Sequence, residues 1–331
     1  MKALIPVAGV GTRLRPHTYT QPKPLIPVAG KPIVGFIIDE LLEVGVREFV
    51  FVIGYLGEKI QQFVEENYPD IETTFIQQPN RMGSGHAIWI AKEALQNTDE
   101  LLIVYGDTIF DVDWRTLLNT PHSCLAIKKV DDPREFGVAE IQEDNLVRSV
   151  EEKPQIPLSN KALVGLYKIK EVDELIQALE NMVQNDIRNQ GEYQLTQAIM
   201  IMIEKGIIFK GIEVNNWFDC GKKEVLLETN AMLLKKMDIV ETTRSPLENS
   251  VIIPPVYIGN DCKITNSIIG PNVSIGDGAE IDYSVVKDSI IGSYAYINGV
   301  VLKSSVIGND TSIKGLCQSL NIGDDTEIDF N

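Results

Sequence analysis

The opening segment of the chain combines glycines with basic side chains in a pattern suited to binding phosphate. In the run AGVGTRLRPHTYTQPKP, Gly9 and Gly11 stand just before Arg13, and Lys23 follows near the end. Glycines let backbone N–H groups approach phosphate oxygens closely, while arginine and lysine side chains bind those oxygens through charge. No acidic residue precedes Asp39, although the whole chain carries a formal charge of −17. We therefore expect a local anion site rather than a loop of solvated charges.

Two common phosphate-binding motifs do not fit this run. It is not a Walker A loop, because no Gly-Lys-Ser/Thr follows the glycines. It is not the dinucleotide fingerprint, because Leu14 stands where a third glycine would be required. Its prolines predict a stiff, extended loop.

The elements that would position this loop are strands and helices in alternation. Short apolar runs and helical patterns follow one another up to about residue 240. This order predicts an α/β fold: a Rossmann-like, mostly parallel sheet with helices on both faces, whose ligands bind beyond the carboxyl ends of the strands. Strands are expected at 2–8, 48–54, 72–78 and 100–107, helices at 32–45, 58–68 and 86–97, and a loop at 215–221 before a long helix.

The last part of the chain has a different pattern of apolar residues. From residue 251 onward, an apolar residue recurs about every six positions, with Gly or Asn between. This period predicts a β-helix of short strands, and its hexapeptide texture resembles that of left-handed β-helices. We therefore expect three parts, namely a domain at 1–240, a linker at 241–250 and a β-helix at 251–331.

Composition excludes several classes of function. Asp and Glu number 47 against 30 Lys and Arg, which argues against binding to nucleic acid or to a membrane surface. Cysteines at 124, 220, 262 and 317 match no zinc or redox spacing, so reduced thiols are expected. No signal peptide and no membrane-spanning run is evident. We expect a cytoplasmic protein.

Two separated motifs carry a family resemblance. The run G-x-G-T-R-L-x-P, followed by P-K-P-L-I-P-V-x-x-K-P-I, resembles the signature of the sugar-1-phosphate nucleotidyltransferases, most of all the long-form glucose-1-phosphate thymidylyltransferases. The resemblance implies transfer of a nucleotidyl group from a nucleoside triphosphate (NTP) to a sugar 1-phosphate, with release of pyrophosphate. The expected pair is dTTP with glucose 1-phosphate, giving dTDP-glucose. UTP-dependent synthesis of UDP-glucose or UDP-N-acetylglucosamine, GTP-dependent synthesis of GDP-mannose, and a non-catalytic regulatory role stay open.

The resemblance also implies roles for individual residues. Arg13 and Lys23 would contact the phosphates, and Mg²⁺ would be held by two aspartates, Asp107 in LLIVYGDTIFD and Asp219 in NNWFDCG. Either aspartate alone would more often be a turn or cap residue. Nucleotide contacts are expected from Ala8, Gly9, Gly11, Gln78 and Gly83, and sugar-phosphate contacts from Gly137, Glu152, Lys153, Gly165 and Glu192.

The C-terminal repeats raise two further questions. Some relatives with such repeats also transfer an acetyl group, using a histidine in the β-helix. The histidines of this chain are His17, His86 and His122, all in its first half, which argues against acyl transfer. His86 is expected to pack or cap rather than act as a general base. The acidic excess and flat apolar edges of the repeats predict a homo-oligomer assembled through the β-helix.

Overall fold

The protein is described here by a computed structural model, which covers residues 1–237 and 247–315. The chain divides into two compact units, Met1–Thr229 and Asn230–Asn331. None of the helices in the described ranges has the length and hydropathy that crossing a lipid bilayer requires.

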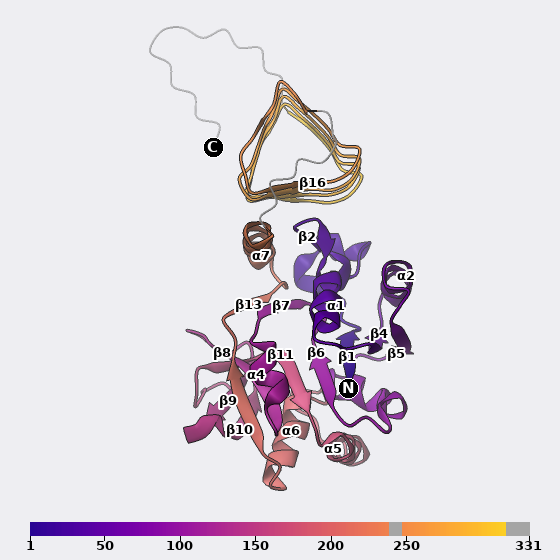
Figure 1. The fold of residues 1–331 in the computed structure, drawn as a ribbon, viewed down its shortest axis with the longest axis vertical. Coiled ribbons are helices and arrows are strands. Elements are labelled where there is room, and N and C mark those ends of the chain that lie inside the picture. Colours follow the sequence, from indigo (N-terminus) through magenta and orange to yellow (C-terminus); the bar gives the residue numbers. More distant parts are fainter. Residues whose placement is uncertain (238–246, 316–331) are drawn as a thin grey trace. The chain divides into compact units, whose positions relative to one another are not determined.

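A twisted sheet with helices packed around it forms the first unit (Figure 1). Its strand order is β10-β9-β11-β6-β1-β4-β5, and the four strands predicted from apolar runs are mutually parallel. The runs of β1, β4 and β6 are largely apolar because both of their faces are buried, whereas β5 lies at the edge of the sheet and is partly exposed. The parallel strands are β1 (Lys2–Val7), β4 (Glu48–Ile53), β5 (Glu72–Gln77) and β6 (Leu101–Val104), and the helices between them are α1 (Ile33–Glu43), α2 (Gly57–Asn67) and α3 (Ser84–Ile90).

The other half of the sheet is largely antiparallel. Strand β11 (Lys161–Ile169) runs antiparallel to β6 and also pairs with β8 and β9. The predicted α/β class is confirmed, and β12 adds a further parallel pairing with β8 in this half. The remaining elements of this half are α4 (Trp114–Asn119), β8 (Ser123–Lys129), β9 (Gly137–Ile141), β10 (Val147–Glu152), α5 (Val172–Gln184), α6 (Leu195–Glu204) and β12 (Phe209–Glu213).

The loop after β1 is coiled rather than extended, so that expectation was wrong. It folds into three consecutive 3-10 turns, at Thr12–Leu14, His17–Tyr19 and Lys23–Leu25. Proline fixes only φ, and that φ suits the start of a helical turn as well as an extended chain. Two short strands, β2 (Pro27–Val28) and β3 (Lys31–Pro32), close the loop.

The segment expected as a loop at 215–221 contains a strand. Strand β13 (Asn216–Asp219) pairs antiparallel with β7 (Thr108–Asp111), with Asp219 opposite Thr108. This two-stranded ribbon brings together two segments far apart in the sequence. The long helix α7 (Lys223–Lys236) follows it, as predicted.

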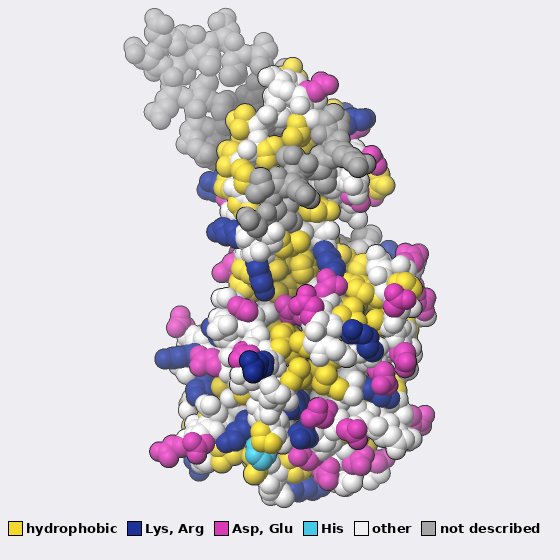
Figure 2. Space-filling view, in the orientation of Figure 1, with side chains coloured by type: hydrophobic (Ala, Val, Ile, Leu, Met, Phe, Trp, Pro, Cys, Tyr) yellow, Lys and Arg dark blue, Asp and Glu magenta, His cyan; other side chains and the backbone are white. Residues whose placement is uncertain are grey.

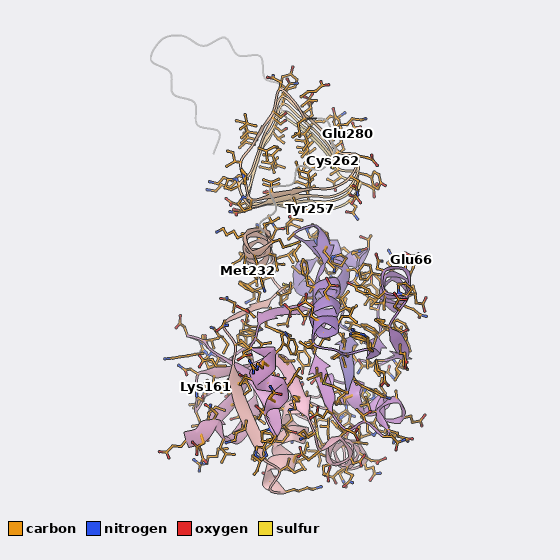
Figure 3. The ribbon with its side chains drawn as sticks, in the orientation of Figure 1. Glu66, Lys161, Met232, Tyr257, Cys262 and Glu280 are labelled. Atoms are coloured by element: carbon orange, nitrogen blue, oxygen red, sulfur yellow. The ribbon has the colours of Figure 1, made fainter. Side chains whose placement is uncertain are left out.

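The second unit is a left-handed β-helix of hexapeptide repeats, as predicted, and Figure 1 shows its triangular cross-section. Three parallel sheets form its sides. Apolar residues stack in register inside, as Ile264, Ile281 and Ile297 do. Figure 3 shows side chains filling the interior of the triangle. The first side consists of β14 (Leu247–Glu248), β17 (Lys263–Thr265), β20 (Glu280–Asp282), β23 (Tyr296–Asn298) and β26 (Ser312–Lys314). The second side consists of β15 (Val251–Ile252), β18 (Ile268–Ile269), β21 (Val285–Lys287) and β24 (Val301–Lys303). The third side consists of β16 (Val256–Ile258), β19 (Val273–Ile275), β22 (Ile290–Ile291) and β25 (Val306–Ile307).

Candidate active site

A pocket of about 410 Å³ opens beyond the carboxyl ends of β1 and β6. This is where ligands bind in sheets of this type. The three loops that follow β1, β5 and β6 contribute most of its lining. Residues predicted for the site that line the pocket are Ala8, Gly9, Gly11, Arg13, Lys23, Gln78, Gly83, Asp107 and Glu192.

The ammonium of Lys23 joins the two predicted metal ligands. Its Nζ lies 2.5 Å from Oδ2 of Asp107 and 3.2 Å from Oδ1 of Asp219. The β7–β13 ribbon makes this possible, because it places Asp219 beside the segment that begins at Asp107. Arg13 extends the cluster, with Nη2 lying 3.3 Å from Oδ2 of Asp219. Two positive and two negative side chains therefore balance one another at the edge of the pocket.

These contacts control the ionisation of the cluster. Burial alone would raise the pKa of Asp107, but the charge and hydrogen bond of Lys23 outweigh it and lower that pKa. Burial likewise disfavours charged Lys23, but Asp107 and Asp219 outweigh it and raise the pKa of the ammonium. Asp107 and Lys23 consequently stay charged at neutral pH.

The donor set fits a magnesium ion that substrate phosphates would help to hold. Asp107 and Asp219 both lie within reach of one point, as their shared contact with Lys23 shows. Within residues 1–237 and 247–315, no group of three or more Asp, Glu, His or Cys side chains is arranged around a metal position. Magnesium needs no such cage, because it takes one or two carboxylates and completes its shell with water and phosphate oxygens.

The two glycines of the first loop serve different purposes. Gly11 has φ 67° and ψ 40°, a left-handed conformation that starts the first 3-10 turn. A Cβ atom on Gly11 would lie 3.0 Å from Cβ of Lys23, whereas a Cβ atom on Gly9 would meet nothing within 4 Å. Gly11 therefore shapes the loop, and Gly9 leaves open space in the pocket.

Gln78 and Gly83, predicted to contact the base, lie on either side of a short loop after β5. The side-chain Nε2 of Gln78 lies 3.3 Å from the carbonyl oxygen of Gly83 and 3.0 Å from Nδ1 of His86. His86 packs between aromatic rings and makes no helix cap, which agrees with the packing role expected for it.

Of the predicted sugar-phosphate residues, Glu192 lines the pocket, whereas Gly137, Glu152, Lys153 and Gly165 lie outside its lining. Glu152 accepts a hydrogen bond from Oγ1 of Thr196 at 3.1 Å, and Gly137 lies against the same carboxylate. Burial raises the pKa of Glu152, and the nearby charge of Glu192 adds to the rise. Gly165 lies against the ring of Tyr105, which lines the pocket. Lys153 is exposed just after β10.

Comparison with known proteins agrees with this geometry. The sequence model of the nucleotidyl transferase family matches residues 2–236. The chain belongs to this family. The predicted membership of the sugar-1-phosphate nucleotidyltransferases is thereby confirmed, and a model of the GlmU-like C-terminal hexapeptide domain matches residues 187–289.

Individual members of the nucleotidyl transferase family show how far the similarity extends. Bifunctional protein GlmU of Methanococcus maripaludis is 38% identical over 256 residues, which cover 76% of this chain and 59% of that protein. Glucose-1-phosphate thymidylyltransferase of Streptomyces antibioticus is 30% identical over 275 residues, covering 80% of this chain and 75% of that protein. The chain thus spans less than two thirds of the length of the GlmU relatives.

A solved structure of the same fold class supports the architecture. UDP-glucose pyrophosphorylase from Acinetobacter baumanii superposes with a TM-score of 0.60 at 21% identity, covering 72% of this chain and 95% of that one. Similarity at this level of identity speaks for the fold alone.

The pocket of this family member also contains residues that sequence reasoning missed. Arg81, Ser84 and Tyr105 line it. Arg81 had a signal, because it is a cation placed between the two expected base contacts, Gln78 and Gly83. Ser84 and Tyr105 had none, since a serine at a helix start and a tyrosine after a strand are ordinary in any α/β protein.

Proposed function

We propose that this protein transfers a nucleotidyl group from an NTP to a sugar 1-phosphate, giving a nucleotide-sugar and pyrophosphate. The observation that carries the proposal is the meeting of Arg13, Lys23, Asp107 and Asp219 at one edge of a glycine-lined pocket. Cations and carboxylates in balance are what a site needs to hold two phosphorylated substrates and a divalent ion together.

The side chains divide the reaction between positioning and charge. Backbone N–H groups around Gly9, with Arg13 and Lys23, would hold the triphosphate oxygens. A phosphate oxygen of the sugar 1-phosphate then forms a bond to the α-phosphorus, the bond from that phosphorus to its leaving oxygen breaks, and pyrophosphate departs with the electron pair. Lys23 offsets the negative charge that spreads over the α-phosphoryl oxygens. Mg²⁺, held by Asp107 and Asp219, would supply further positive charge to those oxygens.

The identities of the base and the sugar are proposed from residues outside the charged cluster. A carboxamide such as that of Gln78 suits the edge of uracil or thymine, so we propose UTP or dTTP as the nucleotide. Glu152 and Glu192 would accept hydrogen bonds from hydroxyls of a hexose 1-phosphate, with glucose 1-phosphate as the first candidate. The similarity to a relative named glucose-1-phosphate thymidylyltransferase supports dTTP.

A substrate matrix tests the proposal. Five NTPs are crossed with five sugar 1-phosphates in the presence of Mg²⁺, and pyrophosphate release is measured. We expect turnover concentrated in the dTTP and UTP rows with a hexose 1-phosphate. Absence of pyrophosphate from every combination, despite a folded protein, would overturn the proposed activity.

We also propose that the β-helix assembles the protein into a homo-oligomer. Outward-facing Val251, Ile268, Val285 and Val301 stand in register on neighbouring strands and are 37–78% exposed. Figure 2 shows apolar side chains gathered on the visible part of this unit. Contiguous exposed apolar surface of this kind favours contact with another protein surface.

Sedimentation analysis tests the assembly. The wild-type chain should sediment as an oligomer at micromolar concentration, and the double variant V285E/V301E should sediment as a smaller species. Lys303→Glu, on the same strand as Val301, serves as the control for a change of charge alone. A monomeric wild-type profile would contradict the proposal.

A further inference from the structure

The carboxamide of Gln78 has only one orientation that satisfies its neighbours. The carbonyl oxygen of Gly83, 3.3 Å away, can only accept a hydrogen bond, so the atom facing it must be the amide nitrogen Nε2. The same Nε2 lies 3.0 Å from Nδ1 of His86. Since Nε2 is a donor, Nδ1 must accept, and the imidazole proton therefore resides on Nε2 of His86.

The imidazole that accepts this bond is itself held in place. His86 is only 8% exposed, on α3, and its ring centroid lies 5.7 Å from that of Trp89 and 6.3 Å from that of Tyr193. Burial, and then the positive charge of Arg188, lowers the pKa of His86, which favours the neutral ring that an accepting Nδ1 requires. The ring cannot turn away without losing its packing.

We infer that His86 is a positioning residue that fixes the carboxamide of Gln78, so that only the acceptor oxygen Oε1 is presented to the base. Both amide protons are used, one by Gly83 and one by His86. No described residue donates a hydrogen bond to Oε1, and Gln78 lines the pocket. Rotating the carboxamide by half a turn would set Oε1 against the carbonyl oxygen of Gly83, where two acceptors repel.

A fixed acceptor selects among pyrimidine bases. Uracil and thymine carry a donor at N3–H, which Oε1 would accept. Cytosine carries a lone pair at N3, which Oε1 would repel. The inference rests on the proposed function, and it deepens that function by assigning the preference for UTP or dTTP over CTP to His86, a residue that would not touch the base itself.

Two substitutions distinguish the effect of the hydrogen-bond acceptor of His86 from the effect of its ring. His86→Phe keeps an aromatic ring between Trp89 and Tyr193 but has no acceptor. His86→Asn has no ring, but its Oδ1 can occupy the position of Nδ1 and accept. Thermal unfolding of both variants shows whether they are folded. The readout is the ratio of kcat/KM for UTP or dTTP to kcat/KM for CTP.

We expect His86→Phe to lower this ratio about fivefold to tenfold, the effect of losing one hydrogen bond that orients the carboxamide. His86→Asn should keep the ratio near that of the wild type. An unchanged ratio in His86→Phe would overturn the inference, as would an equal loss in both variants, because the ring and not the acceptor would then be responsible.

The tautomer of His86 gives a readout that does not depend on turnover. Histidine ¹⁵N NMR of the full chain, with His86→Phe used to assign the signal, should show Nδ1 unprotonated and Nε2 protonated at neutral pH. A proton on Nδ1 would overturn the inference even in an active enzyme. If no NTP is turned over, the proposed function fails, and the tautomer still decides whether His86 orients Gln78.

Discussion

The ammonium of Lys23 lies 2.5 Å from a carboxylate oxygen of Asp107, a residue 84 positions further along the chain. Its second partner, Asp219, comes from a third segment. Lys23 is 6% exposed, so little water shares in its solvation. One buried cation thus ties the loop after β1 to both carboxylates proposed to hold magnesium.

Lys23→Met should abolish most of the activity. Methionine keeps the length of the side chain but removes the charge that would meet the triphosphate and that keeps Asp107 and Asp219 from repelling each other. We expect kcat/KM to fall by about 10²-fold to 10³-fold. Pyrophosphate release measures the loss.

Lys31→Met is the matched control for Lys23→Met. Lys31 pairs with Asp39 and does not line the pocket. Its substitution should change kcat/KM less than about threefold, as expected for a partly exposed ion pair. Similar losses in the two variants would show that general loss of charge, and not the site, explains the effect.

Alanine at Gly9 should weaken NTP binding, whereas alanine at Gly11 should lower folding stability. Gly9→Ala meets no atom within 4 Å, so it should leave the melting temperature unchanged while its methyl group weakens NTP binding. Gly11→Ala forces alanine into a left-handed conformation and should cost about 1–2 kcal/mol of folding free energy. Calorimetric NTP binding and thermal unfolding measure the two effects. Destabilisation by Gly9→Ala would contradict the assignment.

As the pH falls, sugar binding should begin to weaken at a higher pH than it would if the glutamate at the site had its ordinary pKa. Burial raises the pKa of Glu152 above 4.5, so the carboxylate needed to accept hydroxyl hydrogen bonds is lost sooner as the pH falls. KM for the sugar 1-phosphate should therefore rise on going from pH 7 to pH 5.

Glu152→Gln separates this effect from titration of the substrate phosphate. The variant should have a raised KM at pH 7 and a flatter dependence on pH, because only the substrate still titrates. An identical pH profile in wild type and variant would place Glu152 outside the sugar site.

Three cysteines should resist alkylation in the folded protein. Burial raises the pKa of the Cys220 thiol to about 12 and also raises the pKa values of Cys124 and Cys262. At pH 8 these thiols are protonated, and the thiolate is the reactive form. Iodoacetamide followed by peptide mass spectrometry should find them unmodified until urea is added. Cys317 lies outside the described residues.

Rapid labelling of Cys220 in the native protein would have a specific meaning. Its thiol lies 3.5 Å from Oγ1 of Thr229, within the segment that follows Asp219. Labelling would show that this segment opens in solution. Such opening would weaken the proposed role of Asp219 as a fixed metal ligand.

Local sequence pattern was enough to identify the main elements. The apolar runs of β1, β4 and β6 are largely buried, and the six-residue period after residue 251 places apolar side chains inside the β-helix. Burial of neighbouring residues is encoded by the spacing of apolar and polar side chains, so these elements were predicted correctly.

Short polar segments were harder, because their structure depends on partners elsewhere. Strand β13 reads as a loop by itself and becomes a strand only by pairing with β7. The proline-rich loop after β1 was expected to be extended, but it coils into 3-10 turns. Neither outcome follows from local propensity alone.

Residue types and family motifs already specify the cations, carboxylates and glycines of the site in the sequence. How these groups interact follows from the tertiary structure. It gave Lys23 two carboxylate partners, placed Gly9 beside open space and Gly11 in a left-handed turn, and set His86 against Gln78. The reason is physical: a side chain's type sets what it can bind, but distance and burial, created by contacts across the fold, set its charge and orientation.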